Sequence, residues 1–312
     1  MKKIIAVIIV LALLFTFAGC TSQASDYPAR SIKLIVPFGT GGGADQFARI
    51  LEQEIEANTD MELTIVNVPG AATAVGFESF MSEDADGYTM MIATTDTIIN
   101  MAQGISEGDI SEIEALAVPQ LNVDMLFINA SETRFTNFEE MVAYSVDNNV
   151  EIQVATLGVE GSEFLTLSAI SRATGAQFAL IPYSEPGERY AALAGGHVDV
   201  LFEQPGDVRS FVDSGEYLPI ISMSEKRLEA FSDVPCSVEL GIDVTNGYWR
   251  ALLIKSDVPD EYKDVLRDAV MLAINTTSYQ EYADEKYLNL REGYYDEKEV
   301  SEFITSEYNY YK

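Results

Sequence analysis

Beyond residue 31 the chain alternates short apolar runs with amphipathic segments. The run 32–38 is apolar except for one lysine, and a glycine-rich break follows it. In the next segment, 44–58, Phe47, Leu51 and Ile55 recur at the spacing that places them on one face of a helix. A buried strand followed by an amphipathic helix is the repeating unit of α/β proteins, in which helices cover the faces of a mainly parallel sheet.

This alternation occurs in two successive sets that divide near residue 150. The pattern predicts strands at 32–38, 63–68, 88–94, 151–157, 177–183, 197–202, 218–223 and 248–254. It predicts helices at 44–58, 74–81, 163–174, 188–194, 207–214 and 260–274. Two α/β units in tandem indicate two lobes. The simplest arrangement is that the C-terminal segment returns to the first lobe. The chain would then cross between the lobes twice, and the two crossings would form a hinge.

The first nineteen residues have the pattern of an export signal. Two lysines precede an uncharged apolar run, 4–17, which is shorter than the roughly 20 residues of a membrane span. The run ends in small residues before Cys20, an arrangement that resembles a bacterial lipobox. We therefore expect 1–19 to be a lipoprotein signal peptide, Cys20 to be lipidated and 20–27 to form a polar tether. An ordinary cleaved signal and an uncleaved anchor stay open as alternatives.

The formal net charge of the chain is −31, from 19 basic and 50 acidic residues. Such a surface repels nucleic acid, so a nucleic-acid-binding function is excluded. His197 is the single histidine, which leaves no His-based catalytic triad and no His-rich metal site. If Cys20 is lipidated, Cys236 is the one remaining thiol and no intrachain disulfide can form. We expect no cofactor, no metal and no enzymatic activity.

A glycine-rich loop, 39–43, connects the first strand to the first helix and matches, with Ala44, the G-x-G-x-x-A dinucleotide pattern. Nucleotide binding is disfavoured because the second strand ends in Val66-Asn67-Val68 without the acidic residue this pattern needs. The glycines fit either a tight turn or the close approach of a ligand anion to backbone N–H groups, and three in succession favour the ligand. Asp45 stands in the first helical turn, where an acid complements the helix dipole.

Further loops lie where strands end, which is the edge at which open α/β sheets bind ligands. Two of them, 69–72 and 94–96, belong to the first set, and a second glycine-rich loop, 158–162, belongs to the other. Tyr183 and Glu203 end later strands of that second set. None of these loops contains Lys or Arg. The sequence therefore predicts a ligand site rich in backbone donors and hydroxyl groups.

Taken together, the motifs resemble those of the tripartite tricarboxylate transporter receptors, the Bug-type or TctC-like substrate-binding proteins. The N-terminal matches are Tyr27-Pro28, the run 32–38, the glycine loop with Asp45, and the segments 67–71 and 86–89. Later matches, in the family's order, are Gly161-Ser162, Pro182-Tyr183, 194–200, Lys226-Arg227, 233–235 and Trp249. Each motif is modest alone, but together they cover most of the chain from residue 27 to about residue 275.

The resemblance implies an α/β periplasmic-binding-protein-like fold of type II, with mainly parallel sheets and a ligand cleft between two lobes. The lobes are expected at 28–127 with 246–312, and at 128–245. The resemblance also implies a ligand carboxylate held by backbone N–H groups, hydroxyls and water rather than by arginine. Carried onto this chain, the expected ligand-binding residues are Phe38, Gly39, Thr40, Gly41, Gly42, Gly43, Asp45, Gly70, Ala71, Ala72, Thr94, Thr95, Asp96, Gly158, Gly161, Ser162, Tyr183 and Glu203.

Three departures from the family pattern leave the ligand open. The second loop reads Gly-Ala-Ala where more glycine is common, Phe164-Leu165 stands where a His is frequent, and Glu203 replaces the usual Asp. Acidic residues near the cleft (Asp45, Asp96, Glu160 and Glu203) suggest a ligand with a cationic end, such as an amino acid, rather than a tricarboxylate.

Together, the lipobox-like N-terminal segment and the family resemblance lead us to expect an extracytoplasmic, lipid-anchored and monomeric receptor. It would capture a small organic acid or amino acid for the membrane subunits of a tripartite tricarboxylate-type transporter. A ligand sensor for a signalling partner is the alternative. An extracytoplasmic hydrolase is disfavoured because no nucleophile and base stand at a catalytic spacing. The Tyr-rich tail, 294–312, is expected to be a helix on the first lobe, with a docking surface for the membrane subunits as the alternative.

Overall fold

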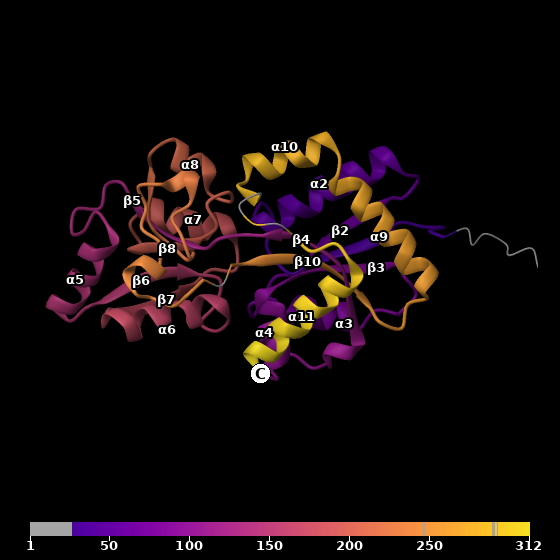
Figure 1. The fold of residues 1–312 in the computed structure, drawn as a ribbon, viewed down its shortest axis with the longest axis horizontal. Helices are drawn as coiled ribbons and strands as arrows, with labels where there is room; N and C mark the ends of the chain where they lie inside the picture. The colour runs from indigo at the N-terminus through magenta and orange to yellow at the C-terminus, as the bar shows by residue number, and fades with distance from the viewer. Residues whose placement is uncertain (1–26, 246, 289–290, 292) are drawn as a thin grey trace, which may run out of the picture.

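The computed structural model describes residues 27–312 except 246, 289, 290 and 292. The expected signal peptide, the lipidation site at Cys20 and most of the tether therefore lie outside the described residues. In the part that is described, no helix is both long enough and apolar enough to cross a membrane. Two lobes lie side by side, each built on a five-stranded sheet (Figure 1).

The sheet of the first lobe combines strands from both ends of the chain. Its order is β2 (Leu63–Asn67), β1 (Ile32–Val36), β3 (Thr89–Thr94), β10 (Trp249–Lys255) and β4 (Ile113–Leu121). The β1 strand pairs in parallel with β2 and β3, whereas β10 runs antiparallel to β3 and β4. The C-terminal strand β10 thus lies inside the sheet that the N-terminal strands begin.

The sheet of the second lobe repeats this plan. Its order is β7 (Gln177–Pro182), β6 (Glu151–Thr156), β8 (Val200–Glu203), β5 (Met125–Asn129) and β9 (Tyr217–Ser222). Two of its pairings are parallel and two are antiparallel. Both sheets are therefore mixed, where the sequence predicted mainly parallel ones. The difference arises because β5 and β10 come directly from the other lobe and enter their sheets from the opposite end.

The chain passes between the sheets twice, once between β4 and β5 and once between β9 and β10. The two crossings touch each other, since the Asn122 backbone N–H donates to the Tyr248 carbonyl at 2.6 Å. A side chain at Gly247 would collide with the Asn122 backbone, so a residue without Cβ is needed where the crossings meet. The two crossings therefore form a narrow connection between the lobes, suited to a hinge.

Helices cover both faces of each sheet. On the first lobe they are α2 (Gly43–Asn58), α3 (Ala74–Met81), α4 (Thr95–Ala102), α9 (Asp260–Ile274), α10 (Thr277–Glu285) and α11 (Glu297–Tyr311). On the second lobe they are α5 (Phe138–Asn148), α6 (Ser162–Thr174), α7 (Pro186–Ala194) and α8 (Arg209–Asp213). Short 3-10 turns lie at Ile110–Glu112, Glu229–Phe231 and Val238–Leu240. The sequence pattern predicted no elements in 97–150, which contains most of α4 together with β4, β5 and α5.

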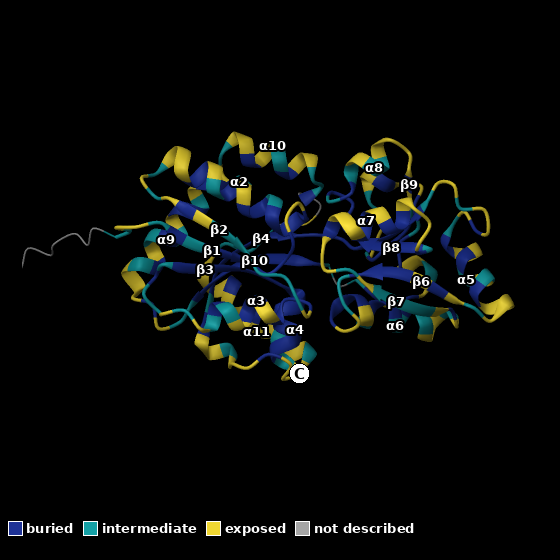
Figure 2. Ribbon diagram, turned by 180° about the vertical axis from the view of Figure 1, so that it is seen from behind, coloured by how far each residue is buried: buried dark blue, intermediate teal, exposed yellow. Residues whose placement is uncertain are grey.

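Successive residues of the central strands point to opposite faces and enter different cores. Leu34 packs with residues of α2 and α9, whereas Ile35 packs with residues of α3, α4 and α11. Because both faces are covered, central strands such as β1, β3 and β10 are almost entirely buried, and most exposed residues lie on the outer helices and loops (Figure 2). The expected helix in the tail is confirmed: α11 packs on the first sheet through Val300 and Ile304.

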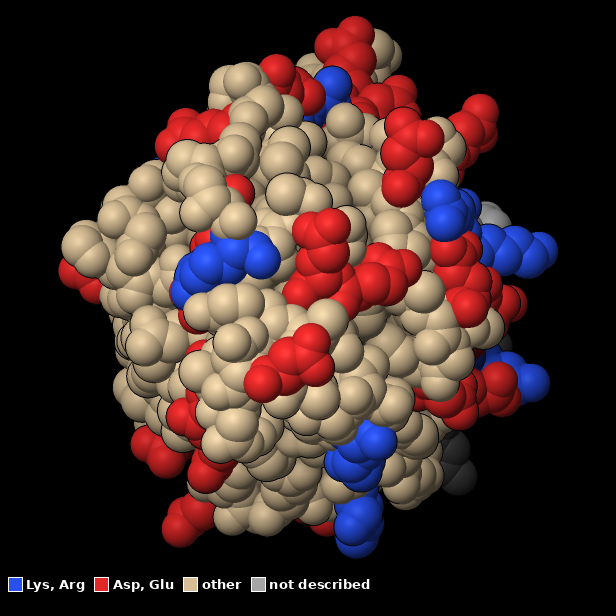
Figure 3. Space-filling view, turned by 90° about the vertical axis from the view of Figure 1, so that its left-hand side faces the viewer, with Lys and Arg blue, Asp and Glu red and all other residues tan. Residues whose placement is uncertain are grey.

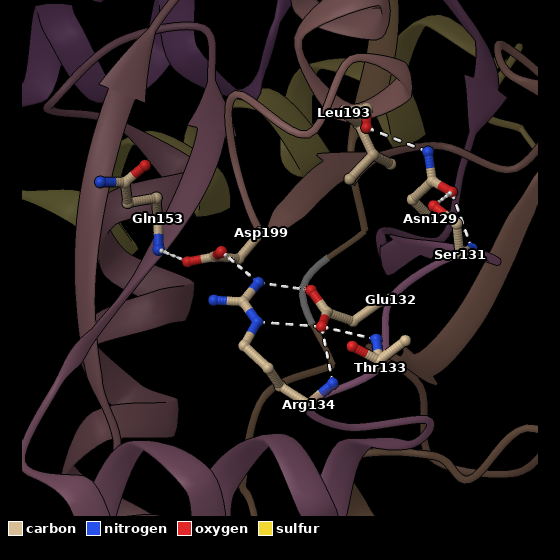
Figure 4. Close-up of polar contacts among 8 residues, drawn as sticks. All are labelled: Asn129, Ser131, Glu132, Thr133, Arg134, Gln153, Leu193 and Asp199. Carbon is tan, nitrogen blue, oxygen red and sulfur yellow. Dashed lines mark hydrogen bonds and ion pairs between the residues drawn. The ribbon is translucent and has the colours of Figure 1, made fainter.

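An ionic network braces the second lobe away from the cleft (Figure 4). Arg134 pairs with Glu132 and, at 2.6 Å, with Asp199, whose other carboxylate oxygen accepts from the Gln153 backbone N–H at 2.7 Å. Hydrogen bonds from Arg134 lower the pKa of Glu132 to about 2. On this end of the molecule, acidic side chains are spread over the surface with a few basic groups between them (Figure 3). This spread agrees with the strongly negative net charge.

Candidate functional site

A narrow cavity lies between the lobes, where the carboxyl ends of β1, β3, β6 and β8 meet. The first lobe contributes Phe38, Gly42, Gly43, Asp96, Tyr248 and Arg250 to its lining, and the second contributes Glu163, Arg189, Glu203, Gln204 and Asp207. The ends of parallel strands in both sheets thus face a shared space, as the sequence predicted for a ligand cleft.

One direct link across the cavity joins the starts of two helices. Asp96, in the first turn of α4, accepts hydrogen bonds at Oδ1 from the backbone N–H of Ser162 at 2.8 Å and from its hydroxyl at 2.9 Å. A carboxylate is favoured there because the first N–H groups of α6 lack partners within the helix. Gly161 has a φ of +85°, and a Cβ on it would lie 2.5 Å from the Asp96 carboxylate. Glycine is therefore required at this position for two reasons.

A second link is a buried ion pair between the lobes. Arg250, from β10, places Nη2 at 2.9 Å from Oδ2 of Asp207 and also donates to Gln120 at 3.0 Å. Both partners of the pair are less than one-tenth exposed. Removing one partner of such a pair costs about 3–5 kcal/mol, because the other charge stays buried without compensation. This pair holds the second lobe against the first at the edge of the cavity.

The third charged contact lies within the second lobe. Arg189, from α7, pairs with Glu203 at the end of β8, and both are almost fully buried. Burial raises the pKa of Glu203 even though the Arg189 charge opposes that shift. The charge of the expected site residue Glu203 is therefore already neutralised by Arg189 from the same lobe.

Other acids at the cavity are buried without a basic partner among the described residues. Burial raises the pKa of Asp96, against the hydrogen bonds from Ser162. It also raises the pKa of Glu163 well above its usual range, although the Arg189 charge works against this. Directly behind the lining residue Gln204, burial raises the pKa of Asp124 to about 7, and a 2.8 Å hydrogen bond from Gln204 opposes it.

The glycine loop after β1 faces the second lobe. A Cβ on Gly42 would lie 2.7 Å from Cγ of Pro186, at the start of α7, and one on Gly39 would collide with Glu185. A Cβ on Gly43 would collide with Asp207 and Arg250. These glycines thus let the loop approach the opposite lobe closely, whatever further contact they make with a ligand.

Asp45 supports this loop from behind. Its carboxylate accepts from the Gly41 backbone N–H at 2.9 Å, from Arg49 at 2.9 Å and from Asn67 at 3.1 Å. Burial alone would raise the pKa of Asp45, but these hydrogen bonds outweigh it and lower that pKa. Its position in the first turn of α2 agrees with the expected role of an acid at the helix dipole.

The second loop of the first lobe is conformationally strained. Ala71, Ala72 and Thr73 have φ values of +46°, +43° and +81° in succession, a region that L-residues other than glycine rarely adopt. With Gly70, Phe38 and Ser184, the two alanines line a second, smaller cavity beside the main one. Strain of this kind gathers at ligand-binding and switch regions, where the surrounding structure maintains it.

The eighteen expected site residues fall into three groups. The lining of the main cavity includes Phe38, Gly42, Gly43, Asp96 and Glu203. The smaller cavity or the contacts between the lobes involve Gly39, Gly70, Ala71, Ala72, Gly158, Gly161 and Ser162. Neither cavity is lined by Thr40, Gly41, Asp45, Thr94, Thr95 or Tyr183. Ligand contact stays a prediction for all of them.

Sequence reasoning missed the charged residues that come from inside helices and strands. Arg189 lies in the middle of α7 and Arg250 inside the apolar strand β10, whereas the sequence motifs point to loops. A charged residue inside an otherwise buried strand was a usable signal, because such a group must find a partner or line a site. Glu163 and Asp207 carried no comparable signal, because the sequence is rich in acids.

The chain resembles known proteins along most of its length. It is 25% identical over 246 residues to the protein BugT of Bordetella pertussis, covering 77% of this chain and 74% of BugT. Among solved structures, MatC of Rhodopseudomonas palustris, determined with bound malate, is 19% identical with a TM-score of 0.81, covering 91% of this chain and 98% of MatC. The protein Rpa4515 of R. palustris, solved with adipate, is 19% identical with a TM-score of 0.82, covering 92% of this chain and 96% of Rpa4515.

These solved structures confirm the two-lobed periplasmic-binding-protein fold that the sequence predicted. The family assignment rests on a separate match. The model of the tripartite tricarboxylate transporter family receptor covers residues 47–312, far more than half of the chain, and the protein therefore belongs to that family of solute-binding receptors.

Proposed function

We propose that this chain is an extracytoplasmic, lipid-anchored receptor that captures a small carboxylate-containing solute and delivers it to a tripartite tricarboxylate-type membrane transporter. The observation that carries the proposal is the polar cavity between two lobes, with lining residues from both of them. A ligand held there touches both lobes, so its binding free energy favours their closed arrangement. A transporter can distinguish this arrangement from an open one.

A carboxylate suits the first-lobe side of the cavity. Gly42 and Gly43 lie at the start of α2, where unpaired backbone N–H groups and the helix dipole attract an anion. Arg250 lies in the same lining. Related structures support the same ligand class, since MatC was solved with malate and Rpa4515 with adipate.

The capture step is tested with the purified chain lacking residues 1–19. We expect a small carboxylate from a panel of malate, adipate, succinate, citrate, glutamate and aspartate to raise Tm, because a ligand that binds the native state alone stabilises it. The same compound should reduce the radius of gyration in solution scattering and be recovered unchanged. Tight binding without compaction would contradict closure, and turnover of the compound would contradict a pure receptor.

The anchoring step is tested in an expressing bacterium. Wild-type protein should incorporate labelled palmitate and fractionate with membranes, and Cys20→Ala should lose both properties. Cys236→Ala is the matched control, because that thiol is buried in the second lobe and should leave labelling unchanged. Labelling that persists in Cys20→Ala would contradict the proposed anchor.

Delivery is tested by solute uptake in cells that contain or lack the membrane subunits of such a transporter. Uptake should need both the receptor and the membrane subunits. Uptake that is unchanged when the receptor is deleted would contradict a role in transport.

A further inference from the structure

Two acids in the lining of the main cavity have only uncharged hydrogen-bond donors. Asp96 accepts from the backbone and hydroxyl of Ser162, and Glu163 accepts from the Leu157 backbone N–H at 2.6 Å. Both are more than nine-tenths buried. Among the described residues, no Lys or Arg forms an ion pair with either of them. The Arg189 charge acts on both acids without forming an ion pair with either. Buried carboxylates without a directly paired cation are costly, so each is either protonated or neutralised by something that enters the cavity.

The two arginines of the lining are already engaged. Arg189 pairs with Glu203 and Arg250 pairs with Asp207, so the lining carries four acids against two cations. Asp124 adds a further buried acid behind Gln204. A dicarboxylate or tricarboxylate would bring two or three more negative charges into this surplus, and like charges in a buried site repel each other strongly.

Two helix starts at the cavity could attract an anion, one in each lobe, and they differ in whether a protein carboxylate already occupies them. The start of α6 in the second lobe is occupied by the protein's own Asp96 carboxylate. The start of α2 in the first lobe, with Gly42 and Gly43, faces the cavity. Beside it, Nε of Arg250 is buried and has no hydrogen-bond partner in the described part of the chain. A ligand carboxylate therefore fits the first-lobe side, next to an unsatisfied donor.

We propose that the ligand is a zwitterion of the amino-acid class, with a carboxylate at the α2 start and Arg250 and a cationic nitrogen against Asp96 and Glu163. This inference rests on the proposed solute-binding function and names the ligand class of the same cavity. Of the acids from which the sequence suggested a cationic ligand end, the proposal keeps Asp96 and adds Glu163. Asp45 is engaged with Arg49, and Glu160 is exposed and does not line the cavity.

The test compares ligands that differ by the amino group alone. Calorimetry measures Kd for aspartate against succinate, glutamate against glutarate, and glutamine against glutaramate. We expect the amino-bearing member of at least one pair to bind about 30-fold or more tightly than its partner, because that is the low end of the effect of a buried charge pair.

Two variants assign the preference to the named carboxylate. Glu163→Gln keeps an oxygen that can accept from the Leu157 N–H but removes the charge, so the preference for the amino-bearing ligand should fall about tenfold or more. Glu160→Gln is the matched control, because it makes the same change at an exposed position three residues away and should keep the preference.

Each outcome decides between the two proposals. If succinate, glutarate and glutaramate each bind as tightly as their amino-bearing partners, or more tightly, the zwitterion is overturned and the carboxylate receptor stands. A preference for the amino group that persists in Glu163→Gln overturns the role of that residue. If none of the twelve Kd values measured for wild type and Glu163→Gln indicates binding, and malate, adipate and citrate also fail to raise Tm, the receptor function itself is refuted, and with it this inference.

Discussion

The carboxylate of Asp96 in the first lobe sits at the first N–H group of α6 in the second lobe, 2.8 Å from the backbone nitrogen of Ser162. The start of α4 therefore supplies the carboxylate that the start of α6 attracts. The contact links the lobes directly at the cavity, so in the proposed receptor it would couple closure to the occupancy and charge of the ligand site.

Replacing Asp96 with Ala should weaken closure. The variant loses two hydrogen bonds from Ser162, each worth about 1.5–3 kcal/mol when one partner is charged. In solution scattering without added ligand, we expect a larger radius of gyration than for wild type. Asp60→Ala, at an exposed position of the first lobe, should match wild type. An unchanged radius for Asp96→Ala would show that this link does not hold the lobes together.

Replacing Gly42 with Ala should impair ligand binding without unfolding the protein. The backbone at Gly42 has φ −79° and ψ 172°, which alanine adopts freely, but its Cβ would lie 2.7 Å from Pro186 across the cleft. We expect Tm without ligand to stay within a few degrees of wild type. Ligand-induced compaction should be lost or reduced.

Gly187→Ala is the control for this effect, because its added Cβ meets no atom within 4 Å. It should bind and compact like wild type. Unfolding of Gly42→Ala would instead favour a purely structural role for the glycine loop. Normal compaction would show that the lobes tolerate the extra atom.

Replacing Ala71 with Gly should stabilise the fold. Ala71 is exposed and has a φ of +46°, where an L-residue with a Cβ is strained by about 1–2 kcal/mol. Glycine relieves that strain but costs about 0.5–1 kcal/mol in chain entropy. We expect a net gain of roughly 0.5–1 kcal/mol in the free energy of unfolding by denaturant titration. Ala130→Gly, an exposed turn position outside the positive-φ set, should instead lose stability.

The stability contribution of Asp124 should depend on pH. Burial raises its pKa from 3.8 to about 7 in the folded protein, where it faces Gln204, Glu203, Asp96 and Arg250. A raised folded pKa means that its contribution is fully present below pH 3.8 and is lost as pH rises through 7.

Asp124→Asn has no such loss, and its amide oxygen can still accept from Gln204. The variant should therefore gain stability relative to wild type between pH 5 and pH 8, by up to about 4 kcal/mol. Asp147→Asn, at an exposed position of α5, is the control and should show no comparable trend. A stability difference that stays constant across this range would contradict ionisation of Asp124 in that window.

Much of this fold was readable from local sequence patterns. A strand that is buried on both faces, such as β1, can be recognised in the sequence as a short apolar run. An amphipathic helix such as α2 can be recognised because its buried residues recur with the helical repeat. The loops at the strand ends followed from the same reasoning, and five of the expected residues line the main cavity. The strand β5 was not predicted, and the direction of β10 did not follow from its local pattern, because that pattern does not show from which lobe the chain enters the strand.

The sequence by itself determined most strands and helices outside 97–150, and its motifs resembled a receptor family to which the chain does belong. Tertiary structure alone decided the charge balance of the cavity. The Arg250–Asp207 pair joins residues 43 positions apart, and the Asp96–Ser162 link joins residues 66 apart. Whether an acid in so acidic a chain is solvated, paired or left for a ligand depends on what folding places beside it. Electrostatic free energy depends on distance and burial in three dimensions, and neither is local in sequence.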